Sequence, residues 1–387
     1  MARKVIHVAL NGVTGRMGYR QHLVRSLLAI REQGGIPLDD GTSLYPEPVL
    51  VGRSEERLRA IAERHGLPRW TTNLDEVLGD PEVGVYFDTQ VTSARETAVA
   101  RAIEAGKHVY TEKPVAASAA AAFGLAEAAR AAGITHGVVQ DKLFLPGIIK
   151  LRRLVREGFF GRVLSVRLEF GYWVFEGDGY PAQRPSWNYR AEDGGGIVLD
   201  MFPHWQYLLE DLFGPVSAVY ARCATHLPKR WDEAGEPYGV TADDAAYAVL
   251  EFGGGVVASV NSSWAVRVNR RELLELQVDG THGSAVAGLR NCAVQHKVST
   301  PMPVWNPDLP DPIEYQELWS DVPDNMDYGN GFKAQWELFL RAAARGAPFG
   351  WDLFAGARGV QLAELAMLSS AEGRRVAVPA PEFRGLT

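Results

Sequence analysis

The sequence contains only two cysteines among its 387 residues, Cys223 and Cys292, and they lie far apart along the chain. Neither has a spacing to the histidines that is typical of a metal site, so no metal ligand set is predicted. Two distant cysteines do not build the disulfide framework of a small secreted domain, although one disulfide between them stays open as an alternative. We therefore expect a reduced, cytoplasmic environment.

The sequence also lacks a long apolar run and an excess of basic residues. Residues 1–10 are too short and too polar for a signal peptide, and no later run reaches the length of a membrane span. The net charge is −7, which gives nucleic acids and anionic membranes little attraction for the surface. We expect a small-molecule partner, no nucleic acid and no membrane. The length allows two domains with separate cores.

A turn rich in glycine follows the first predicted strand, residues 1–10. Gly12, Gly15 and Gly18 have the spacing Gly-x-x-Gly-x-x-Gly, and apolar residues then recur at helical spacing over 19–30. Glycines permit a tight turn and close backbone approach, while the helix N-terminus presents free N–H groups to a pyrophosphate. The alternative is a loop that merely turns. The residues predicted to contact a dinucleotide here are Gly12, Thr14, Gly15, Arg16 and Met17.

Strands and helices continue to alternate through the first part of the chain. The predicted elements are residues 49–51, 55–65, 84–87, 94–105, 108–110, 116–132 and 135–139. This order predicts an α/β domain, residues 1–145, with a doubly wound parallel sheet of the Rossmann type. Residues 32–48, rich in Gly, Pro and Asp, are expected to form a surface excursion.

Residues at the end of the second predicted strand bear on the choice of cofactor. A free ribose 2′-hydroxyl usually needs a carboxylate there, whereas a 2′-phosphate needs a cation and small donors. This chain has Arg53 and Ser54. We predict that both contact the cofactor and that NADP is favoured or accepted beside NAD. The alternative is that Ser54 caps the next helix and Arg53 is solvated.

The pattern changes after residue 145. A helix is predicted over 146–157, followed by β-rich segments at 162–174, 216–225, 245–252, 256–268 and 273–278. Such runs predict an α+β domain, residues 146–387, built on a large and mainly antiparallel open sheet. Residues 301–327 look like an extended arm or loop. Two further helices, 331–345 and 353–370, are expected to close the chain back on the sheet or on the first domain.

A stretch of the second domain, residues 193–205, combines three glycines with a carboxylate and an imidazole. Asp200 and His204 are four residues apart and share one face if a helix begins nearby. An imidazole oriented by a carboxylate is a common general acid/base. The alternative is a helix start with Asp200 as N-cap and His204 packed on its first turn.

A second reactive pair lies in the first domain, after the predicted strand 108–110. Glu112 and Lys113 fall at the carboxyl end of a parallel strand, which is where open α/β sheets bind ligands. A lysine in this position can reach a substrate, although a Glu-Lys dipeptide is commonly a surface ion pair.

These three motifs together resemble the glucose-fructose oxidoreductase/inositol dehydrogenase (Gfo/Idh/MocA) family. The motifs are the glycine turn, Gly-Lys-His-Val-x-x-Glu-Lys-Pro over 106–114, and Gly-Gly-Gly-x-x-x-Asp-x-x-x-His over 194–204. The resemblance covers nearly the whole chain. It implies a Rossmann domain, a second open-sheet domain often used for oligomerisation, and a nicotinamide cofactor. It further implies hydride transfer at a sugar or cyclitol carbon.

The resemblance also implies roles for individual residues. Lys113 matches the catalytic lysine of the family, and Asp200 with His204 matches its proton-handling pair. Lys142 stands where members carry a substrate-contacting arginine. Thr89 and Glu112 complete the predicted cofactor-binding set. Two segments depart from the family pattern: Asp88-Thr89-Gln90 replaces a frequent Thr-Pro-Asn, and Phe202 replaces a small residue.

Aromatic residues concentrate over 172–190, just before the Asp200/His204 stretch. Aromatic faces suit carbohydrate rings, and Trp187 and Tyr189 are predicted to contact the substrate, although such clusters also form cores or subunit interfaces. We interpret the chain as an NAD(P)-dependent oxidoreductase of a sugar, sugar acid or cyclitol. The alternatives are a glycosidase that oxidises its sugar transiently and a non-catalytic dinucleotide-binding regulator. An exposed sheet face predicts a homodimer or homotetramer.

Overall fold

The computed structural model of the chain describes residues 2–267, 272–301, 306, 308, 310 and 313–380. The chain divides into two compact units, one of Met1–Phe144 with Gly329–Gln361 and one of Leu145–Tyr328 with Leu362–Thr387. This division differs from the predicted domains in residues 329–361. They belong to the first unit because the apolar face of helix α8 (Gly331–Arg345) packs into its core.

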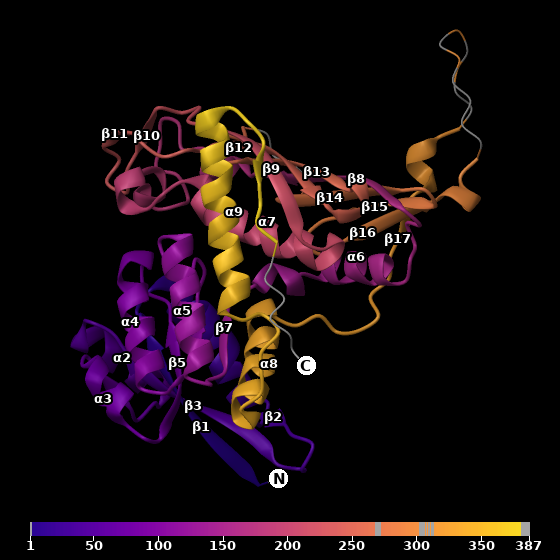
Figure 1. Ribbon diagram of the computed structural model, residues 1–387. Helices are drawn as coiled ribbons and strands as arrows, with labels where there is room; N and C mark the ends of the chain where they lie inside the picture. The colour runs from indigo at the N-terminus through magenta and orange to yellow at the C-terminus, as the bar shows by residue number, and fades with distance from the viewer. Residues whose placement is uncertain are drawn as a thin grey trace. The chain divides into compact units, whose positions relative to one another are not determined.

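A mainly parallel sheet forms the centre of the first unit (Figure 1). Its described strands run in the order β2-β3-β1-β5-β6-β7, with β4 paired to β3 and only the β2–β3 pair antiparallel. The strands are β1 (Arg3–Asn11), β2 (Ile36–Pro37), β3 (Ser43–Val51), β4 (Trp70–Thr71), β5 (Val83–Asp88), β6 (His108–Thr111) and β7 (His136–Val138). Because β1 lies at the reversal of strand order, the loops after β1 and β5 meet at the ligand-binding edge.

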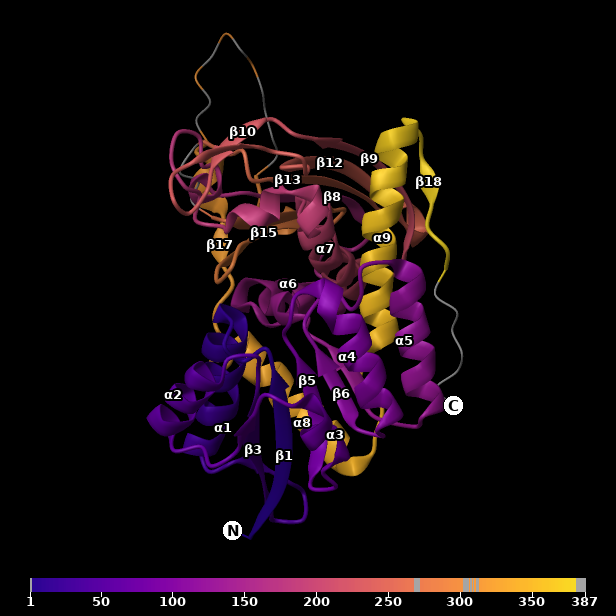
Figure 2. The same cartoon turned by 90° about the vertical axis from the view of Figure 1, so that its left-hand side faces the viewer.

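Helices cover both faces of this sheet. They are the π-helix Gly18–Leu28, α1 (Ala29–Glu32), α2 (Glu55–His65), α3 (Leu74–Gly79), α4 (Thr92–Glu104), α5 (Ala119–Ala131), the 3₁₀-helix Asp141–Phe144, α8, and the start of α9 (Leu353–Glu372). Figure 2 shows α4 and α5 side by side over one face. The π-helix and α8 contact each other, and both contribute to the core on the opposite face.

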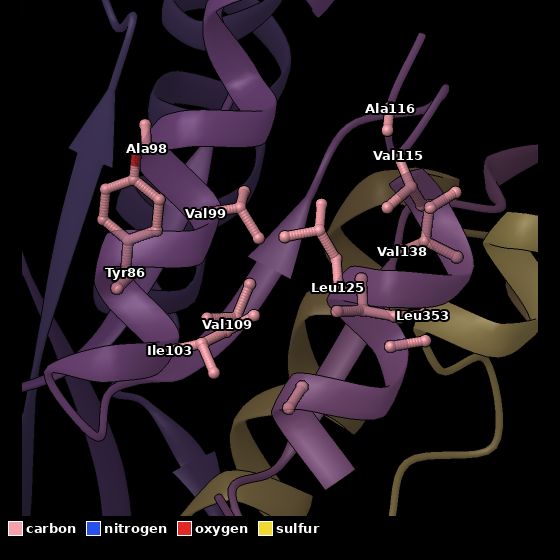
Figure 3. Close-up of a cluster of buried hydrophobic side chains, with 14 of the residues drawn as sticks. Tyr86, Ala98, Val99, Ile103, Val109, Val115, Ala116, Leu125, Val138 and Leu353 are labelled. Carbon is pink, nitrogen blue, oxygen red and sulfur yellow. The ribbon is translucent and has the colours of Figure 1, made fainter. Parts of the chain in front are cut away.

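Each strand of the sheet supplies side chains to two separate cores. In β5, Tyr86 joins the cluster under α4 and α5, whereas Val85 and Phe87 join the cluster under the π-helix and α8. This alternation follows from the two-residue period of a strand. Figure 3 shows the first cluster, in which Leu353 of α9 completes the packing.

The excursion predicted over residues 32–48 is an edge ribbon of the sheet. Ile36 and Pro37 pair with Leu44 and Ser43, so β3 begins six residues before the predicted strand. Proline is tolerated here because β2 is an edge strand with few ladder bonds to lose.

A larger sheet organises the second unit. Within the described residues its order is β17-β16-β15-β14-β8-β13-β12-β9-β18, and only the β8–β13 pair is parallel. The strands are β8 (Val163–Phe170), β9 (Val216–Ala224), β12 (Ala245–Phe252), β13 (Val257–Ser263), β14 (Leu274–Gly280), β15 (Gly283–Ala287), β16 (Cys292–His296), β17 (Ser320–Asp321) and β18 (Val376–Ala377). A separate pair joins β10 (Lys229–Trp231) to β11 (Pro237–Gly239).

One face of the larger sheet is covered by α6 (Pro146–Arg156) and α7 (Ile197–Phe213), as Figures 1 and 2 both show. Short 3₁₀-helices interrupt the loops at Trp173–Phe175, Ser186–Tyr189, Ala191–Asp193, Gly253–Gly255, Lys297–Ser299 and Tyr315–Leu318. Val268 and, within the arm predicted over 301–327, residues 302–305, 307, 309, 311 and 312 lie outside the described residues.

Both cysteines are free thiols in the structure. Burial raises the pKa of Cys292 to about 12. No helix in the described part of the chain is long and apolar enough to span a bilayer.

Candidate active site

The predicted site residues are divided between the two units. Those in the first are Gly12, Thr14, Gly15, Arg16, Met17, Arg53, Ser54, Thr89, Glu112, Lys113 and Lys142. Those in the second are Trp187, Tyr189, Asp200 and His204. The residues expected to hold a dinucleotide therefore share one unit, and the proton-handling pair belongs to the other.

The glycine turn after β1 leaves no room for side chains. Gly12 has φ of +83°, and a Cβ there would lie 3.0 Å from the carbonyl carbon of Thr89. A Cβ on Gly18 would lie 2.8 Å from the carbonyl oxygen of Gly12. The Gly12 N–H donates to the Val51 carbonyl (3.1 Å), and the Thr89 N–H donates to that of Asn11 (3.0 Å). The turn is thus a bare backbone surface at the carboxyl ends of the strands, as a pyrophosphate requires.

The other predicted turn residues surround this surface. The Gly15 N–H donates to the Gly12 carbonyl at 3.0 Å, and Arg16 is exposed while Met17 is half-buried. The methyl carbon of Thr14 lies 3.6 Å from a Cβ built on Gly52, so it packs near the end of β3.

A cavity of about 250 Å³ opens beside the turn in the first unit. It is lined by Asn11, Val51, Gly52, Arg53, Thr72, Leu74, Gln90, Ala94, Thr97, Ala98 and Arg101. Two arginines and no carboxylate are among these lining residues. Arg101 is paired with Asp75 outside the lining, whereas Arg53 lies just after strand β3, where Rossmann folds contact the nucleotide ribose.

The two residues predicted to select the cofactor have different surroundings. Arg53 is exposed at the cavity. The Ser54 hydroxyl accepts a hydrogen bond from the Arg57 N–H at 3.4 Å and caps α2. The structure thus shows the capping role that was the alternative for Ser54. The prediction that NADP is accepted therefore depends mainly on Arg53.

Asp88, which departs from the family pattern, is the centre of a buried network. Its carboxylate accepts hydrogen bonds from the Tyr86 hydroxyl (2.7 Å), the Gln90 N–H (2.9 Å) and Arg95 Nε (3.3 Å). Burial raises the pKa of Asp88. Arg95 also donates to the carbonyl of Pro114. The network joins the loop after β5 to the Lys113–Pro114 segment. The sequence analysis missed Arg95, whose only signal was an arginine amid the small residues of α4.

Glu112 is buried and holds the backbone of Lys113. The Trp336 N–H donates to His22 Nδ1 (3.0 Å), and His22 Nε2 lies 2.8 Å from Glu112 Oε1. An indole only donates, so the neutral His22 carries its proton on Nε2 and donates it to Glu112. Glu112 Oε2 accepts the Lys113 N–H at 3.1 Å.

This arrangement gives Glu112 a structural role beside the cofactor contact predicted for it. Burial acts to raise the pKa of Glu112, but the His22 hydrogen bond and the nearby Lys113 and Arg95 charges outweigh it and lower that pKa. Both carboxylate oxygens therefore have partners within the protein, and the side chain positions Lys113. His22 was missed by the sequence analysis because a single histidine beside the apolar residues of a helix is usually an ordinary core residue.

Lys142 is partly buried in the 3₁₀-helix that follows β7. Its ammonium lies 2.6 Å from the Asp141 carboxylate. A substrate hydroxyl bound by Lys142 would thus meet an ion pair, which offers both donors and acceptors.

In the second unit, the glycines before α7 bring the chain close to Asp243. Gly196 has φ of +122°, and the Ile197 and Val198 N–H groups donate to the Asp243 carbonyl (3.0 Å) and carboxylate (2.8 Å). Burial raises the pKa of Asp243. Because α7 begins at Ile197, the alternative in which Asp200 is the N-cap is wrong.

Asp200 lies in the first turn of α7 and is paired with an arginine. Arg184 Nη1 is 2.7 Å from the Asp200 carboxylate, and each side chain is about a quarter exposed. The Arg184 guanidinium lies over the rings of Trp264 (4.5 Å to the centroid) and Phe175 (5.1 Å). These cation–π contacts fix the cation, which in turn fixes the carboxylate. The sequence analysis assigned no role to Arg184.

His204 is one turn further along α7 and is 5% exposed. Its Nδ1 lies 2.6 Å from the hydroxyl of Tyr207. Asp200 and His204 are four residues apart on this helix, so they share a face as predicted.

The two aromatic residues predicted to contact substrate differ in exposure. Trp187 is 47% exposed, so it is open to a ligand. Tyr189 is 0% exposed, its hydroxyl donates to the Phe175 carbonyl (2.8 Å), and Arg230 lies 4.2 Å above its ring. The substrate contact predicted for Tyr189 is therefore corrected, because this side chain belongs to the core.

Comparison with known proteins decides the family. The chain is 56% identical over 379 residues to the D-xylose dehydrogenase of Paenarthrobacter nicotinovorans, covering 97% of this chain and 98% of that protein. Residues 6–139 match the family model described as an oxidoreductase family with an NAD-binding Rossmann fold. Residues 148–286 match the GFO/IDH/MocA C-terminal domain. The chain belongs to the GFO/IDH/MocA oxidoreductase family.

Further relatives of this GFO/IDH/MocA protein agree in fold. It is 30% identical over 257 residues to the 1,5-anhydro-D-fructose reductase of Ensifer adhaerens, covering 65% of this chain and 70% of the relative. It superimposes on levoglucosan dehydrogenase in complex with NADH and L-sorbose with a TM-score of 0.80. That pair is 23% identical and covers 97% and 99% of the two chains. The predicted fold, a Rossmann domain followed by a mainly antiparallel one, is confirmed.

The GFO/IDH/MocA assignment makes the protein a nicotinamide-dependent oxidoreductase. The turn at Gly12 and Gly18 fits the pyrophosphate of such a cofactor, because neither residue places a side chain between the backbone and a ligand. A Cβ at either position would lie within 3.0 Å of neighbouring backbone atoms. No cluster of metal-ligating side chains is found among the residues that the structure describes.

Proposed function

We propose that this protein oxidises a CH–OH group of a sugar with NAD(P), and that D-xylose is its leading substrate. The similarity to a D-xylose dehydrogenase along nearly the whole of both chains carries the proposal. The arrangement of Asp200 and His204 on one face of α7 supports it, because oxidation of an alcohol needs a base for the hydroxyl proton.

Each polar residue has a definite part in this chemistry. His204 accepts the hydroxyl proton, and the Lys113 ammonium stabilises the developing alkoxide. The bound nicotinamide supplies the hydride acceptor. Asp200, held by Arg184, favours the imidazolium that forms on its helix face. Trp187 and Lys142 are proposed to contact the sugar.

The proposed function is tested with the purified chain and a panel of sugars. D-xylose, levoglucosan, other pentoses and hexoses, and cyclitols are each supplied with NAD and with NADP, and reduced nicotinamide is followed by absorbance. We expect D-xylose to give the highest kcat/KM. Sugar turnover without net cofactor reduction would instead indicate the transient-oxidation glycosidase, and no turnover of any sugar would overturn the proposal.

Arg53 is expected to govern the use of NADP. Replacing it with alanine should lower kcat/KM for NADP about tenfold, the value of one partly exposed charged hydrogen bond, and change that for NAD less than about twofold. The reason is that Arg53 lies at a cavity whose lining includes no carboxylate to repel a 2′-phosphate. Steady-state kinetics with both cofactors measures this.

The control for this substitution is Arg25→Ala. Arg25 is exposed on the π-helix and does not line the cavity. Its replacement by alanine therefore removes one positive charge from the same unit, away from the cavity. A strong wild-type preference for NAD that Arg53→Ala leaves unchanged would contradict the prediction.

We also propose that the protein forms a homodimer or homotetramer through the face of the larger sheet opposite α6 and α7. Tyr220, Val249 and Val257 are exposed apolar side chains on this sheet, and Val249 pairs with Tyr220 across β9 and β12. Exposed apolar side chains grouped on one sheet mark an association surface.

Light scattering at micromolar concentration should give the mass of a dimer or tetramer. Val249→Glu should reduce that mass because it buries a charge in the interface. Leu338→Glu, at an exposed position of α8, should leave it unchanged. A monomeric wild-type protein would disprove the association.

A further inference from the structure

The hydroxyl of Tyr207 lies within hydrogen-bond distance of Nδ1 of His204. The two atoms are 2.6 Å apart, and the side chains are 5% and 6% exposed. Both residues lie on α7 at a spacing of three, with ring planes 80° apart. Helical spacing brings the two side chains together, and their burial limits the rotamers that each can adopt.

Asp200, the other candidate for orienting His204, has its charge engaged by Arg184. That ion pair is 2.7 Å long, and its cation is held between the Trp264 and Phe175 rings. Moving the carboxylate would separate the pair and leave Arg184 without its charge partner. Asp200 thus makes the ion pair with Arg184, whereas Tyr207 makes the hydrogen bond with Nδ1 of His204.

We propose that Tyr207 is a positioning residue whose hydroxyl oxygen accepts a hydrogen bond from Nδ1–H of His204 and so keeps Nε2 as the basic nitrogen. This inference rests on the proposed function, in which His204 is the general base. A neutral imidazole has one N–H and one acceptor nitrogen, so a proton held on Nδ1 requires the acceptor to be Nε2. The substrate hydroxyl proton then moves to Nε2, and Nδ1 keeps its own.

The same contact stabilises the imidazolium after proton transfer. Both ring nitrogens of an imidazolium are donors, and a buried donor without an acceptor is costly. The Tyr207 oxygen provides that acceptor for Nδ1. Among the described residues, the charged groups along α7 are Asp200, which pairs with Arg184, Asp243 at the helix N-terminus, Glu210, which contacts Gln206, and Asp211, which pairs with Arg152.

Tyr207→Phe tests the proposal because it removes one oxygen and keeps the ring. The acidic limb of the kcat/KM profile for sugar oxidation should move to lower pH by about one unit, since a lost hydrogen bond to the imidazolium disfavours it. The plateau kcat should fall about tenfold, because a weaker base accepts the proton less readily. Cofactor affinity should stay unchanged.

Tyr247→Phe is the matched control. Its hydroxyl also contacts a histidine ring, His226 Nε2 at 2.8 Å, but on an exposed part of the sheet. This variant should keep the wild-type pH profile. An unchanged profile for Tyr207→Phe, or a shift of its acidic limb to higher pH, would overturn the proposal.

A measurement on the unmodified protein covers the case in which Tyr207→Phe does not fold. Nitrogen NMR of the ¹⁵N-histidine-labelled holoenzyme, with His204 assigned by its absence in His204→Gln, should show the Nδ1–H tautomer. The Nε2–H tautomer would overturn the inference. Full activity of His204→Gln would refute the proposed function instead, so the two failures are distinguishable.

Discussion

Replacing His204 with alanine is expected to lower kcat by about 10²–10⁴-fold, which is the usual contribution of a positioned general base. The imidazole is buried at a defined position on α7. A water molecule acting as the base in its place would be less basic and less precisely positioned. Cofactor affinity should stay within about twofold of wild type, since every residue predicted to hold the dinucleotide belongs to the other unit. Steady-state kinetics and cofactor titration measure the two quantities.

His226→Ala provides the control for this loss. His226 is an imidazole of the same unit that contacts Tyr247, outside the predicted site. Its removal should leave kcat unchanged. Asp200→Asn should be less damaging than His204→Ala, because it weakens the stabilisation of the imidazolium without removing the base. If the His204→Ala variant kept near-wild-type kcat across the accessible pH range, Lys113 would have to be the general base.

Lys113→Ala is expected to be at least as damaging as His204→Ala. Removing one preorganised group that stabilises a developing oxyanion costs about 10²–10³-fold in kcat, and this lysine also orients the hydroxyl. The Lys113 backbone N–H is held by Glu112, which His22 and Trp336 hold in turn, so the side chain extends from a fixed backbone position. The measurement is kcat with the substrate identified in the sugar panel.

Two further variants sharpen this second prediction. Lys4→Ala removes an exposed lysine from the same unit and should leave kcat unchanged. The double variant Lys113→Ala/His204→Ala should lose less activity than the product of the single losses, because both groups serve one proton transfer. Fully multiplicative losses would show that the two residues act in separate steps.

Local patterns were sufficient for the Rossmann elements. Glycines at 12, 15 and 18 have a physical requirement that the sequence displays directly, because a Cβ at Gly12 or Gly18 meets backbone. The alternation of apolar strands with amphipathic helices likewise predicted the parallel sheet and the boundary near residue 145. The assignment of residues 329–361 to the first unit could not be predicted, because contacts with residues distant in sequence determine the sheet on which a helix packs.

Contacts between distant residues were not accessible from patterns. Nothing in the sequence near Lys113 indicates that His22 and Trp336 support it, since these residues are 314 positions apart from each other. The same holds for Arg184 and Asp200, and for Asp243 at the start of α7. Tyr189 was assigned to the pocket for this reason, because the local sequence around an aromatic residue does not distinguish a pocket from a core.

The sequence by itself determined the residue types, the glycine turn, the Glu-Lys-Pro segment and the Asp200/His204 spacing, because these depend on neighbours within a few positions. The tertiary structure decided which groups each of them touches: Glu112 faces His22, Asp200 faces Arg184, and His204 faces Tyr207. The physical reason is that a buried polar group must find a partner, and folding, rather than sequence proximity, determines which partner is within reach.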